Sequence, residues 1–363
     1  MTMSILELPT TAIARIFVRI DLSRPSINQI STYTCLTMKN NQRRFIGKLE
    51  VSPIGLGCMP LSGYPPEKSF MLDNRDQAIQ TVHAALDAGI NFLDTGDSYS
   101  PTWNPYGHNE KLIAEAIRSW SGSAAAKAKI IVATKAGITR EKNDTWYGEL
   151  GFNSTRSYLY RAVEGSAARL GVDKIKLWQH HRIDPKLTIE EQYENVNTLK
   201  EHGMVENFGL SNVTVAQLKV GLKIIGGPKE GGVVSVQNEF SPRFRVNSDV
   251  LDLCTELGIA FLPWSPLGGI GKPKNVTSDS YATLHEMANR KNVSVFALTI
   301  AWHLAKSPIT IPIPGSSQPA TILDSLSGSE IDLSAVEFAE LENGLPETSI
   351  ETGTYIPKKP AAN

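Results

Sequence analysis

Three short stretches decide the fold of this chain: NFLDTGDSY at residues 91–99, VATKAG at residues 132–137 and LWQHHRIDP at residues 177–185. Each begins like a buried strand and changes to charged or turn-forming residues where that strand ends. Continuous apolar, β-branched runs are typical of parallel strands that are covered on both faces. Because parallel strands have their carboxyl ends on one side of a sheet, the polar residues that end these stretches are expected to lie close together.

The same alternation of strand and helix extends from these stretches along most of the chain. Strands are expected at residues 54–58, 91–95, 129–134, 174–180, 207–210, 233–237, 259–263 and 309–313. Helices are expected at residues 75–88, 108–120, 154–170, 189–202, 215–224 and 248–257, with more within 280–306. This number of units predicts an α/β fold, a (β/α)8 TIM barrel. We also expect a short N-terminal β-hairpin that caps the bottom of the barrel.

The main rival fold is a doubly wound sheet that binds a dinucleotide. That fold needs a GxGxxG turn between its first strand and the following helix. The nearest match is GLG at residues 55–57, which is followed by Cys58 and Met59 rather than by the rest of the motif. The sequence therefore favours the closed barrel.

The length of 363 residues suits one barrel with extensions. The apolar residues near the amino end are interrupted by arginines, so the uninterrupted core of a secretory signal is absent, and a transit peptide is a weaker alternative to a flexible extension. The expected division is an N-terminal extension over residues 1–44, a barrel over residues 45–347 and a C-terminal tail over residues 348–363.

Composition excludes several classes of partner. The formal net charge is -1, from 36 basic and 37 acidic residues, so no overall field would attract nucleic acid or an anionic membrane. No apolar run approaches the roughly 20 residues of a membrane span. Cys35, Cys58 and Cys254 are far apart and form no CxxC pair, which indicates neither a disulfide framework nor a zinc site. We expect a cytoplasmic protein and, by default, a monomer.

Four residues near the predicted strand ends suit the reduction of a carbonyl group. Tyr99 could donate a proton near neutral pH if a buried ammonium, Lys135, lowers its pKa. Asp94 would hold that ammonium, and His181 would fix the substrate oxygen.

Each of these residues also has a structural interpretation. Asp94 could cap a turn, and Lys135 could extend outward to solvent. His180 and His181 are adjacent, so they point to opposite faces of a strand, and parity alone does not choose between them.

Together these residues resemble the aldo-keto reductase superfamily, over nearly all of residues 49–344. DTGDSY at residues 94–99 matches the family pattern, as do Lys135 at the end of the third strand and His181 before Arg182. The resemblance implies that Asp94, Tyr99, Lys135 and His181 are catalytic. It also implies that an aldehyde or ketone is reduced to an alcohol, with a nicotinamide cofactor as hydride donor.

The resemblance further implies a cofactor site along the later strand ends. GLSN at residues 209–212 and Gln237 would hold the carboxamide, and Trp264 would stack on the nicotinamide. The implied cofactor-binding residues are Gly57, Cys58, Asp94, Ser211, Asn212, Gln237, Trp264, Ser265, Leu267, Gly315, Ser316, Ser317, Gln318 and Thr321. The chain departs from the family at Thr321, where an arginine is common, so NADPH is the first expectation and NADH the alternative.

Aromatic residues in the loops after the first three strands suggest an aromatic or flat apolar carbonyl substrate. The candidate substrate-binding residues are Tyr64, Trp103, Tyr106, Trp146 and Tyr147. The alternative is that these rings stiffen long loops against the barrel.

Other functions stay open at this point. A metal-assisted hydrolase could use His180, His181 and Asp184, but barrel metal sites need ligands at several strand ends, usually with an HxH pair, and none occurs. A non-catalytic subunit that binds the cofactor would be expected to carry a broken set of four residues, whereas this set is intact. The same residues would also run the reaction toward alcohol oxidation.

Overall fold

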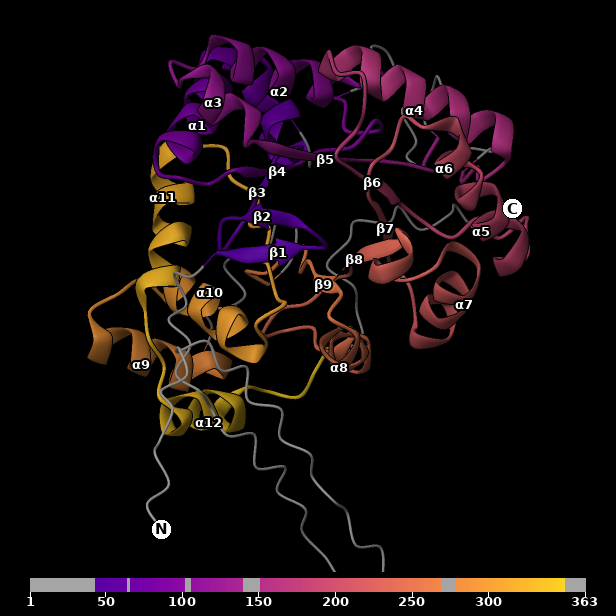
Figure 1. Ribbon diagram of the computed structural model, residues 1–363. Coiled ribbons are helices and arrows are strands. Elements are labelled where there is room, and N and C mark those ends of the chain that lie inside the picture. Colours follow the sequence, from indigo (N-terminus) through magenta and orange to yellow (C-terminus); the bar gives the residue numbers. More distant parts are fainter. Residues whose placement is uncertain (1–42, 64–65, 102–105, 140–150, 269–278, 350–363) are drawn as a thin grey trace, which may run out of the picture. The chain divides into compact units, whose positions relative to one another are not determined.

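The computed structural model describes residues 43–63, 66–101, 106–139, 151–268 and 279–349 (Figure 1). The expected extension over residues 1–44 and the tail over residues 348–363 therefore lie almost entirely outside the described residues, and the proposed domain boundaries stay predictions. No helix among the described residues has both the length and the apolar character that a membrane span requires.

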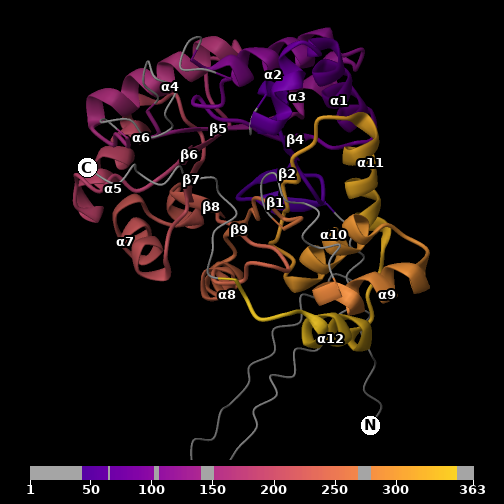
Figure 2. The ribbon, with the colours of Figure 1, turned by 180° about the vertical axis from the view of Figure 1, so that it is seen from behind.

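A curled, parallel sheet of seven strands forms the centre of the fold. Neighbouring strands follow the order of the sequence, and helices surround the sheet on its outer side (Figures 1 and 2). The strands are β3 (Leu56–Gly57), β4 (Phe92–Asp94), β5 (Ile131–Ala136), β6 (Leu177–His180), β7 (Phe208–Ser211), β8 (Val233–Gln237) and β9 (Ala260–Phe261). Each lies within one or two residues of a predicted strand, apart from shorter amino ends in β3 and β6.

The predicted eighth strand, residues 309–313, closes the barrel between β9 and β3. It does not form a regular series of backbone hydrogen bonds with both neighbours. The N–H groups of Ile311 and Ile313 donate to carbonyls of Phe261 and Pro263 on the β9 side. On the β3 side, Pro312 and Pro314 only accept, from the N–H groups of Gly55 and Gly57. Because proline has no N–H group, this edge carries half of the usual bonds, which explains why the segment is joined to β3 and β9 by isolated bridges.

The helices confirm the predicted pattern and add elements to it. They are α1 (Arg75–Asp87), α2 (His108–Ser119), α3 (Ala124–Ala128), α4 (Arg156–Leu170), α5 (Ile189–Asn197), α6 (Leu199–His202), α7 (Val215–Ile225), α8 (Ser248–Leu257), α9 (Ala282–Lys291), α10 (Val295–Lys306), α11 (Pro319–Ser327) and α12 (Ala335–Gly344). The helix expected at residues 189–202 is divided at Thr198. Residues 319–327, for which the sequence analysis predicted no helix, form α11, with Pro319 at the first helical position, where proline is favoured.

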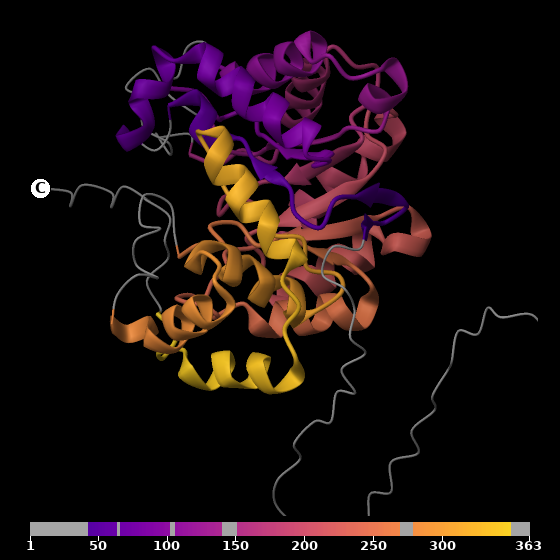
Figure 3. The ribbon, with the colours of Figure 1, turned by 90° about the vertical axis from the view of Figure 1, so that its left-hand side faces the viewer.

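The expected N-terminal hairpin is formed by β1 (Arg44–Ile46) and β2 (Leu49–Val51), which pair antiparallel. It lies at the amino ends of the barrel strands, at one end of the sheet in the side view of Figure 3. Ile46 and Val51 are fully buried in the same cluster as Phe92, Leu177 and Val234, which point into the barrel. Burying each such side chain contributes about 1.5–3 kcal/mol, so the hairpin is part of the barrel core.

Candidate active site

The predicted catalytic residues meet at the carboxyl ends of three neighbouring strands. Asp94 is the last residue of β4, Lys135 lies near the end of β5, and His181 directly follows β6. Tyr99 comes from the loop after β4. Lys135 is fully buried, and Asp94, Tyr99 and His181 are each less than a tenth exposed. The ends of these strands thus place the four predicted catalytic residues close together, as the sequence predicted.

The Lys135 ammonium is held by three acceptors. It donates to Asp94 Oδ2 at 2.7 Å, to the Thr95 carbonyl at 2.7 Å and to the Tyr99 hydroxyl at 3.2 Å. Burial acts to lower the pKa of Lys135, but Asp94 and Tyr99 raise it above the usual value. The amine therefore stays protonated, and its third proton is directed at the Tyr99 oxygen.

Two buried amides support Asp94 from the opposite side. Gln237 Nε2 donates to Asp94 Oδ1 at 2.8 Å, and Gln179 Nε2 lies 3.4 Å from the same oxygen. Charge-assisted bonds of this kind stabilise an ionised carboxylate and fix its rotamer. Sequence reasoning assigned Gln237 to the carboxamide of the cofactor and did not select Gln179, although both are polar residues on otherwise apolar strands.

The pKa of Tyr99 requires a correction to the sequence argument. Burial raises the pKa of the Tyr99 hydroxyl, and the neighbouring Lys135 opposes this shift without overcoming it. Lys135 therefore does not bring the Tyr99 pKa below its ordinary value, as the sequence argument expected. Tyr99 instead stays protonated at neutral pH, which is the state that a proton donor needs.

The structure separates the two adjacent histidines. His181 lies edge-on to the Tyr99 ring, with the ring centroids 5.7 Å apart, whereas His180 Nε2 contacts Ser154 Oγ at 2.7 Å on the other face of the strand. Burial lowers the pKa of both, that of His180 to about 4. Lys135 and Arg182 lower the His181 pKa further, so His181 is a neutral imidazole beside Tyr99.

The residues predicted to bind the nicotinamide form a linked set at the ends of β7, β8 and β9. Ser211 Oγ donates to the Gln237 carbonyl at 2.8 Å, and Asn212 Nδ2 donates to Ser211 Oγ at 2.7 Å. Trp264 Nε1 in turn donates to Asn212 Oδ1 at 3.1 Å. Asn212 and Ser265 have positive φ values of 60° and 50°, which cost non-glycine residues energy and often mark functional sites.

The first loop of the predicted cofactor site is tightly packed. A Cβ atom on Gly57 would lie 2.8 Å from the Ile313 carbonyl and 3.2 Å from the N atom of Gly315, so only glycine fits beside the eighth strand. The Cys58 side chain is fully buried, and its Sγ lies 3.3 Å from the Leu56 carbonyl. Leu267 packs against the core between the sheet and its helices.

The eighth loop presents hydroxyl groups at the start of α11. Ser316 and Ser317 are largely buried, and the Ser316 hydroxyl contacts both the Gln318 carbonyl and the Thr321 hydroxyl. Ser317 receives two side chains from the first part of the chain, because Gln77 Nε2 donates to its carbonyl at 2.8 Å and Lys68 Nζ to its Oγ at 3.2 Å. Sequence reasoning missed both contacts, since these partners are 240 and 249 residues away.

Among the candidate substrate-binding residues, only Tyr106 is described. Its hydroxyl donates to the Ile138 carbonyl at 2.7 Å, so its polar end already has a partner. Whether its ring meets a substrate stays a prediction. The other four, Tyr64, Trp103, Trp146 and Tyr147, lie outside the described residues.

A buried acidic cluster behind β4 and β5 was not foreseen. Glu110 is fully buried, accepts a bond from the Thr134 hydroxyl and forms an ion pair with Arg169. Asp97 is also fully buried, and its pKa is well above the usual value because of burial and the nearby Glu110. These groups connect the loop that carries Tyr99 to α2 and α4.

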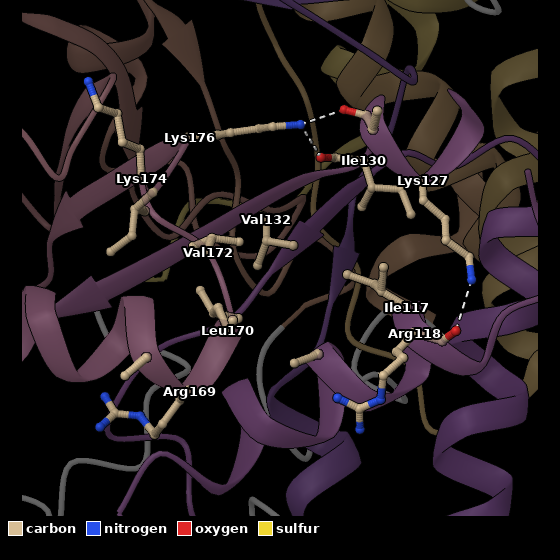
Figure 4. Close-up of a pocket in the computed structure, with 15 residues that line it drawn as sticks. Ile117, Arg118, Lys127, Ile130, Val132, Arg169, Leu170, Val172, Lys174 and Lys176 are labelled. Atoms are coloured by element: carbon tan, nitrogen blue, oxygen red, sulfur yellow. Dashed lines mark hydrogen bonds between the residues drawn. The ribbon is translucent and has the colours of Figure 1, made fainter. Parts of the chain in front are cut away.

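A groove of about 530 Å³ lies on the outer face of the sheet, away from these strand ends (Figure 4). Its apolar floor includes Ile130 and Val132, and lysines stand at its rim. Lys176 donates to the carbonyls of Ala128 and Ile130, and Lys127 to the carbonyl of Arg118. These cations serve backbone carbonyls, so we assign the groove a structural role.

No group of three or more His, Cys, Asp or Glu side chains could hold a metal ion in the part of the chain that the structure describes. His180 and Asp184, the candidate ligands of a hydrolase, instead bind Ser154 from two sides. His180 contacts its hydroxyl, and Asp184 Oδ2 accepts its N–H at 3.0 Å.

Comparison with known proteins gives a consistent result. The model of the aldo/keto reductase family matches residues 53–345. An uncharacterized oxidoreductase of Schizosaccharomyces pombe is 32% identical over 304 residues, which cover 82% of this chain and 88% of that protein. A 6-dehydroglucose reductase of Novosphingobium aromaticivorans is 33% identical over 288 residues, which cover 76% of this chain and 86% of that protein.

A solved structure shares the fold. The aldo/keto reductase from Klebsiella pneumoniae, in complex with NADP and acetate, aligns with a TM-score of 0.66 and 21% identity, and covers 86% of this chain and 97% of that one.

Proposed function

Because this chain belongs to the aldo/keto reductase family and is an oxidoreductase, we propose that it reduces an aldehyde or ketone to an alcohol, with Tyr99 as the proton donor. The observation that carries the proposal is the bonding of Lys135. This ammonium is held by Asp94 and a backbone carbonyl and directs its remaining proton at the Tyr99 oxygen. A buried lysine held in this way has no evident role in packing, whereas it would stabilise a tyrosinate as it forms.

The residues at the same strand ends fit a nicotinamide cofactor. The buried Ser265 hydroxyl has no hydrogen-bond partner among the described residues, and Asn212 and Ser265 hold strained backbone conformations. Ser211, Asn212 and Gln237 offer the amide and hydroxyl groups that suit a carboxamide. We assign Trp264 to the face of the nicotinamide and residues 315–318 with Thr321 to its adenosine end. NADPH is the preferred cofactor and NADH the alternative.

The bound cofactor supplies the hydride, and the protein supplies the proton and the geometry. Tyr99 donates its hydroxyl proton to the carbonyl oxygen of the substrate. Lys135 stabilises the charge left on Tyr99, and Asp94 keeps Lys135 in place with the help of Gln179 and Gln237. His181 is neutral, so its single ring N–H orients the substrate oxygen and the ring does not compete with Tyr99 as the proton donor.

Burial keeps Tyr99 protonated at neutral pH, which is the state that donates a proton in reduction. Alcohol oxidation would use the same residues, with Tyr99 as the base.

Three further proposals concern the substrate class, the location and the oligomeric state of the protein. Aromatic or flat apolar carbonyl compounds are the proposed substrates, because the sequence contains several aromatic residues between the first strands of the barrel and the helices that follow them. The cytoplasm is the proposed location, since Cys58 and Cys254 are buried free cysteines. A monomer is the proposed state.

The test is the consumption of NADPH, and separately of NADH, with a panel of aromatic and aliphatic aldehydes and ketones. Tyr99→Phe serves as the control because it removes the hydroxyl with little change in shape. Turnover that depends on Tyr99 would support the proposal. Cofactor binding without turnover by the wild-type protein, over the whole panel, would contradict it and favour a regulatory binding role.

A further inference from the structure

The adenosine end of the proposed cofactor site lacks a cation of its own. Between Lys306 and Lys358 the sequence contains neither lysine nor arginine. This interval includes the whole eighth loop and α11, and Thr321 stands where the family often has an arginine. Neutral hydroxyls bind a phosphate less strongly than a guanidinium or an ammonium does. If NADPH is the cofactor, its charge must be recognised by another part of the chain.

Lys68 supplies an ammonium at this place from the first loop of the barrel. Its Nζ lies 3.2 Å from Ser317 Oγ, although the two residues are 249 positions apart in sequence. Gln77, in α1, holds the backbone of the same serine through its carbonyl. In Figures 1 and 3, α1 and α11 lie side by side, which agrees with this contact. Lys68 itself lies in the 3-10 helix Pro66–Leu72 that precedes α1, so the packing of α1 against α11 brings this first loop close to the eighth loop.

The Lys68 ammonium forms no ion pair with an acidic side chain in the part of the chain that the structure describes. It lies 5.7 Å from the centre of the Phe70 ring. Two nearby charged groups have partners elsewhere, since Arg75 pairs with Glu115 and Asp324 accepts a bond from Ser294. Ser317 uses one of the three ammonium protons, which leaves two for a ligand.

We propose that Lys68 is the specificity-determining residue for the 2'-phosphate of NADPH and takes the place of the arginine absent at position 321. The inference rests on the proposed function, because it assumes that the adenosine end of the cofactor lies at residues 315–318. The 2'-phosphate is the group that distinguishes NADPH from NADH. A contact between Lys68 and this group therefore strengthens the binding of NADPH and leaves the binding of NADH unchanged. The hydroxyls of Ser316, Ser317 and Thr321 complete the site.

The experiment measures the binding of two adenosine fragments by isothermal titration calorimetry. The fragment 2',5'-ADP carries the 2'-phosphate, and 5'-AMP lacks it. The wild-type chain is compared with Lys68→Met, with Lys68→Arg, which keeps the charge, and with Lys223→Met, a control at an exposed position on α7. Thermal unfolding of each variant verifies that the fold is unchanged.

We expect Lys68→Met to weaken the binding of 2',5'-ADP about tenfold and to leave 5'-AMP within about twofold of wild type. Lys68→Arg and Lys223→Met should bind both fragments like the wild-type chain. The salt dependence of 2',5'-ADP binding should also decrease in Lys68→Met, because one cationic contact is lost.

Two results would overturn the inference. The first is equal affinity of Lys68→Met and wild type for 2',5'-ADP. The second is a wild-type chain that does not distinguish 2',5'-ADP from 5'-AMP, which would mean that no 2'-phosphate site exists. In either case, Tyr99-dependent reduction with NADH or NADPH would leave the proposed function intact, so the two failures are distinguishable.

Discussion

The two ends of the barrel differ in how their polar side chains are hydrogen-bonded, although the buried Thr310 hydroxyl at the amino end also has no partner among the described residues. At the amino ends of the strands, the Arg44 guanidinium donates to the carbonyls of Leu304, Ser307 and Thr310 at 2.7–3.0 Å. The partly buried Asn91, at the same end, accepts a bond from the Ser52 N–H and donates to the carbonyls of Glu50 and Lys129. Buried groups that are satisfied within the protein contribute to stability and leave nothing for a ligand.

At the carboxyl ends of the strands, several buried groups keep unused hydrogen-bonding capacity. His181 Nδ1 and Ser265 Oγ have no partner among the described residues. Leaving such groups unsatisfied costs about 1–3 kcal/mol each, unless a ligand bonds to them. The contrast shows that one end of the barrel is built for stability and the other for binding and chemistry.

Backbone conformation follows the same division. At the amino end, the turn between β1 and β2 uses a glycine, Gly47, at a φ of 59°. At the carboxyl end, the similar φ values of Asn212 and Ser265 are held by residues with side chains, at a cost of about 1–3 kcal/mol each. Both strained residues therefore lie at the end of the barrel that carries the proposed cofactor site.

The largest effect is expected from Lys135→Met. Activity should fall about 1000-fold, because the tyrosinate loses its counter-charge. The variant should also lose about 3–5 kcal/mol of unfolding free energy, because Asp94 is left as an uncompensated buried charge. Steady-state kinetics and urea unfolding measure the two effects.

The double variant Asp94→Asn with Lys135→Met separates these effects. It should recover most of the stability and none of the activity. Recovery of both stability and activity would mean that Lys135→Met is inactive because it is less stable, and that Lys135 has no direct role in the reaction.

Acid should destabilise the protein through the carboxyl-end histidines. The pKa is about 4 for His180 and about 3 for His303, which contacts the Pro266 carbonyl behind this end. These pKa values lie below that of an unfolded histidine, so below about pH 6.5 the unfolded chain binds more protons. Stability is therefore present above pH 6.5 and is lost as the pH falls toward 4. His180 alone accounts for roughly 3 kcal/mol.

Urea unfolding between pH 7 and pH 4 measures this loss. His180→Asn should reduce the proton uptake on unfolding by one over that range. An unchanged slope in His180→Asn would show that His180 is protonated in the folded state, contrary to its burial. Arg44 differs here, because burial lowers its pKa only to about 10 and it stays charged throughout.

The complementary test at the amino end is Arg44→Met. It leaves three buried carbonyls without their donor, so we expect a loss of about 2–3 kcal/mol in unfolding free energy. The kinetic constants should be unchanged at temperatures where the variant is folded. Normal stability together with weakened catalysis in Arg44→Met would contradict the view that the amino end contributes to stability and the carboxyl end to catalysis.

A smaller effect is expected from Gln179→Leu, which removes the longer of the two amide contacts to Asp94. The turnover number should fall about tenfold or less, since Gln237 still holds the carboxylate. The pH profile of kcat/KM should shift, because Asp94 acts on Tyr99 through Lys135. A lower rate with an unchanged profile would indicate a loss of packing only.

The sequence predicted the barrel and the four central residues because their signals are local. Strand runs such as residues 129–134 are continuous and apolar, and the polar residues that end them mark one edge of the sheet. Such features need only neighbouring residues to be recognised. The sequence also predicted an eighth strand at residues 309–313, but not that its prolines would leave it joined to its neighbours by isolated bridges.

The missing parts depend on residues that are distant in sequence. The choice of His181 over His180 is set by Ser154 and Tyr99, which occupy opposite faces of the strand. The Lys68–Ser317 contact arises from the packing of α1 against α11. The net pKa of Tyr99 depends on burial, which overcomes the lysine that the sequence does show.

The most direct test of the central claim is a single-turnover reduction of an aromatic aldehyde with NADPH that carries deuterium at both hydrogen positions of nicotinamide C4, followed by mass spectrometry of the alcohol. The wild-type chain should transfer deuterium to the carbonyl carbon, and Tyr99→Phe should do so at least about 100-fold more slowly while binding the cofactor normally. Equal rates in the two proteins, or an alcohol without deuterium, would contradict the account.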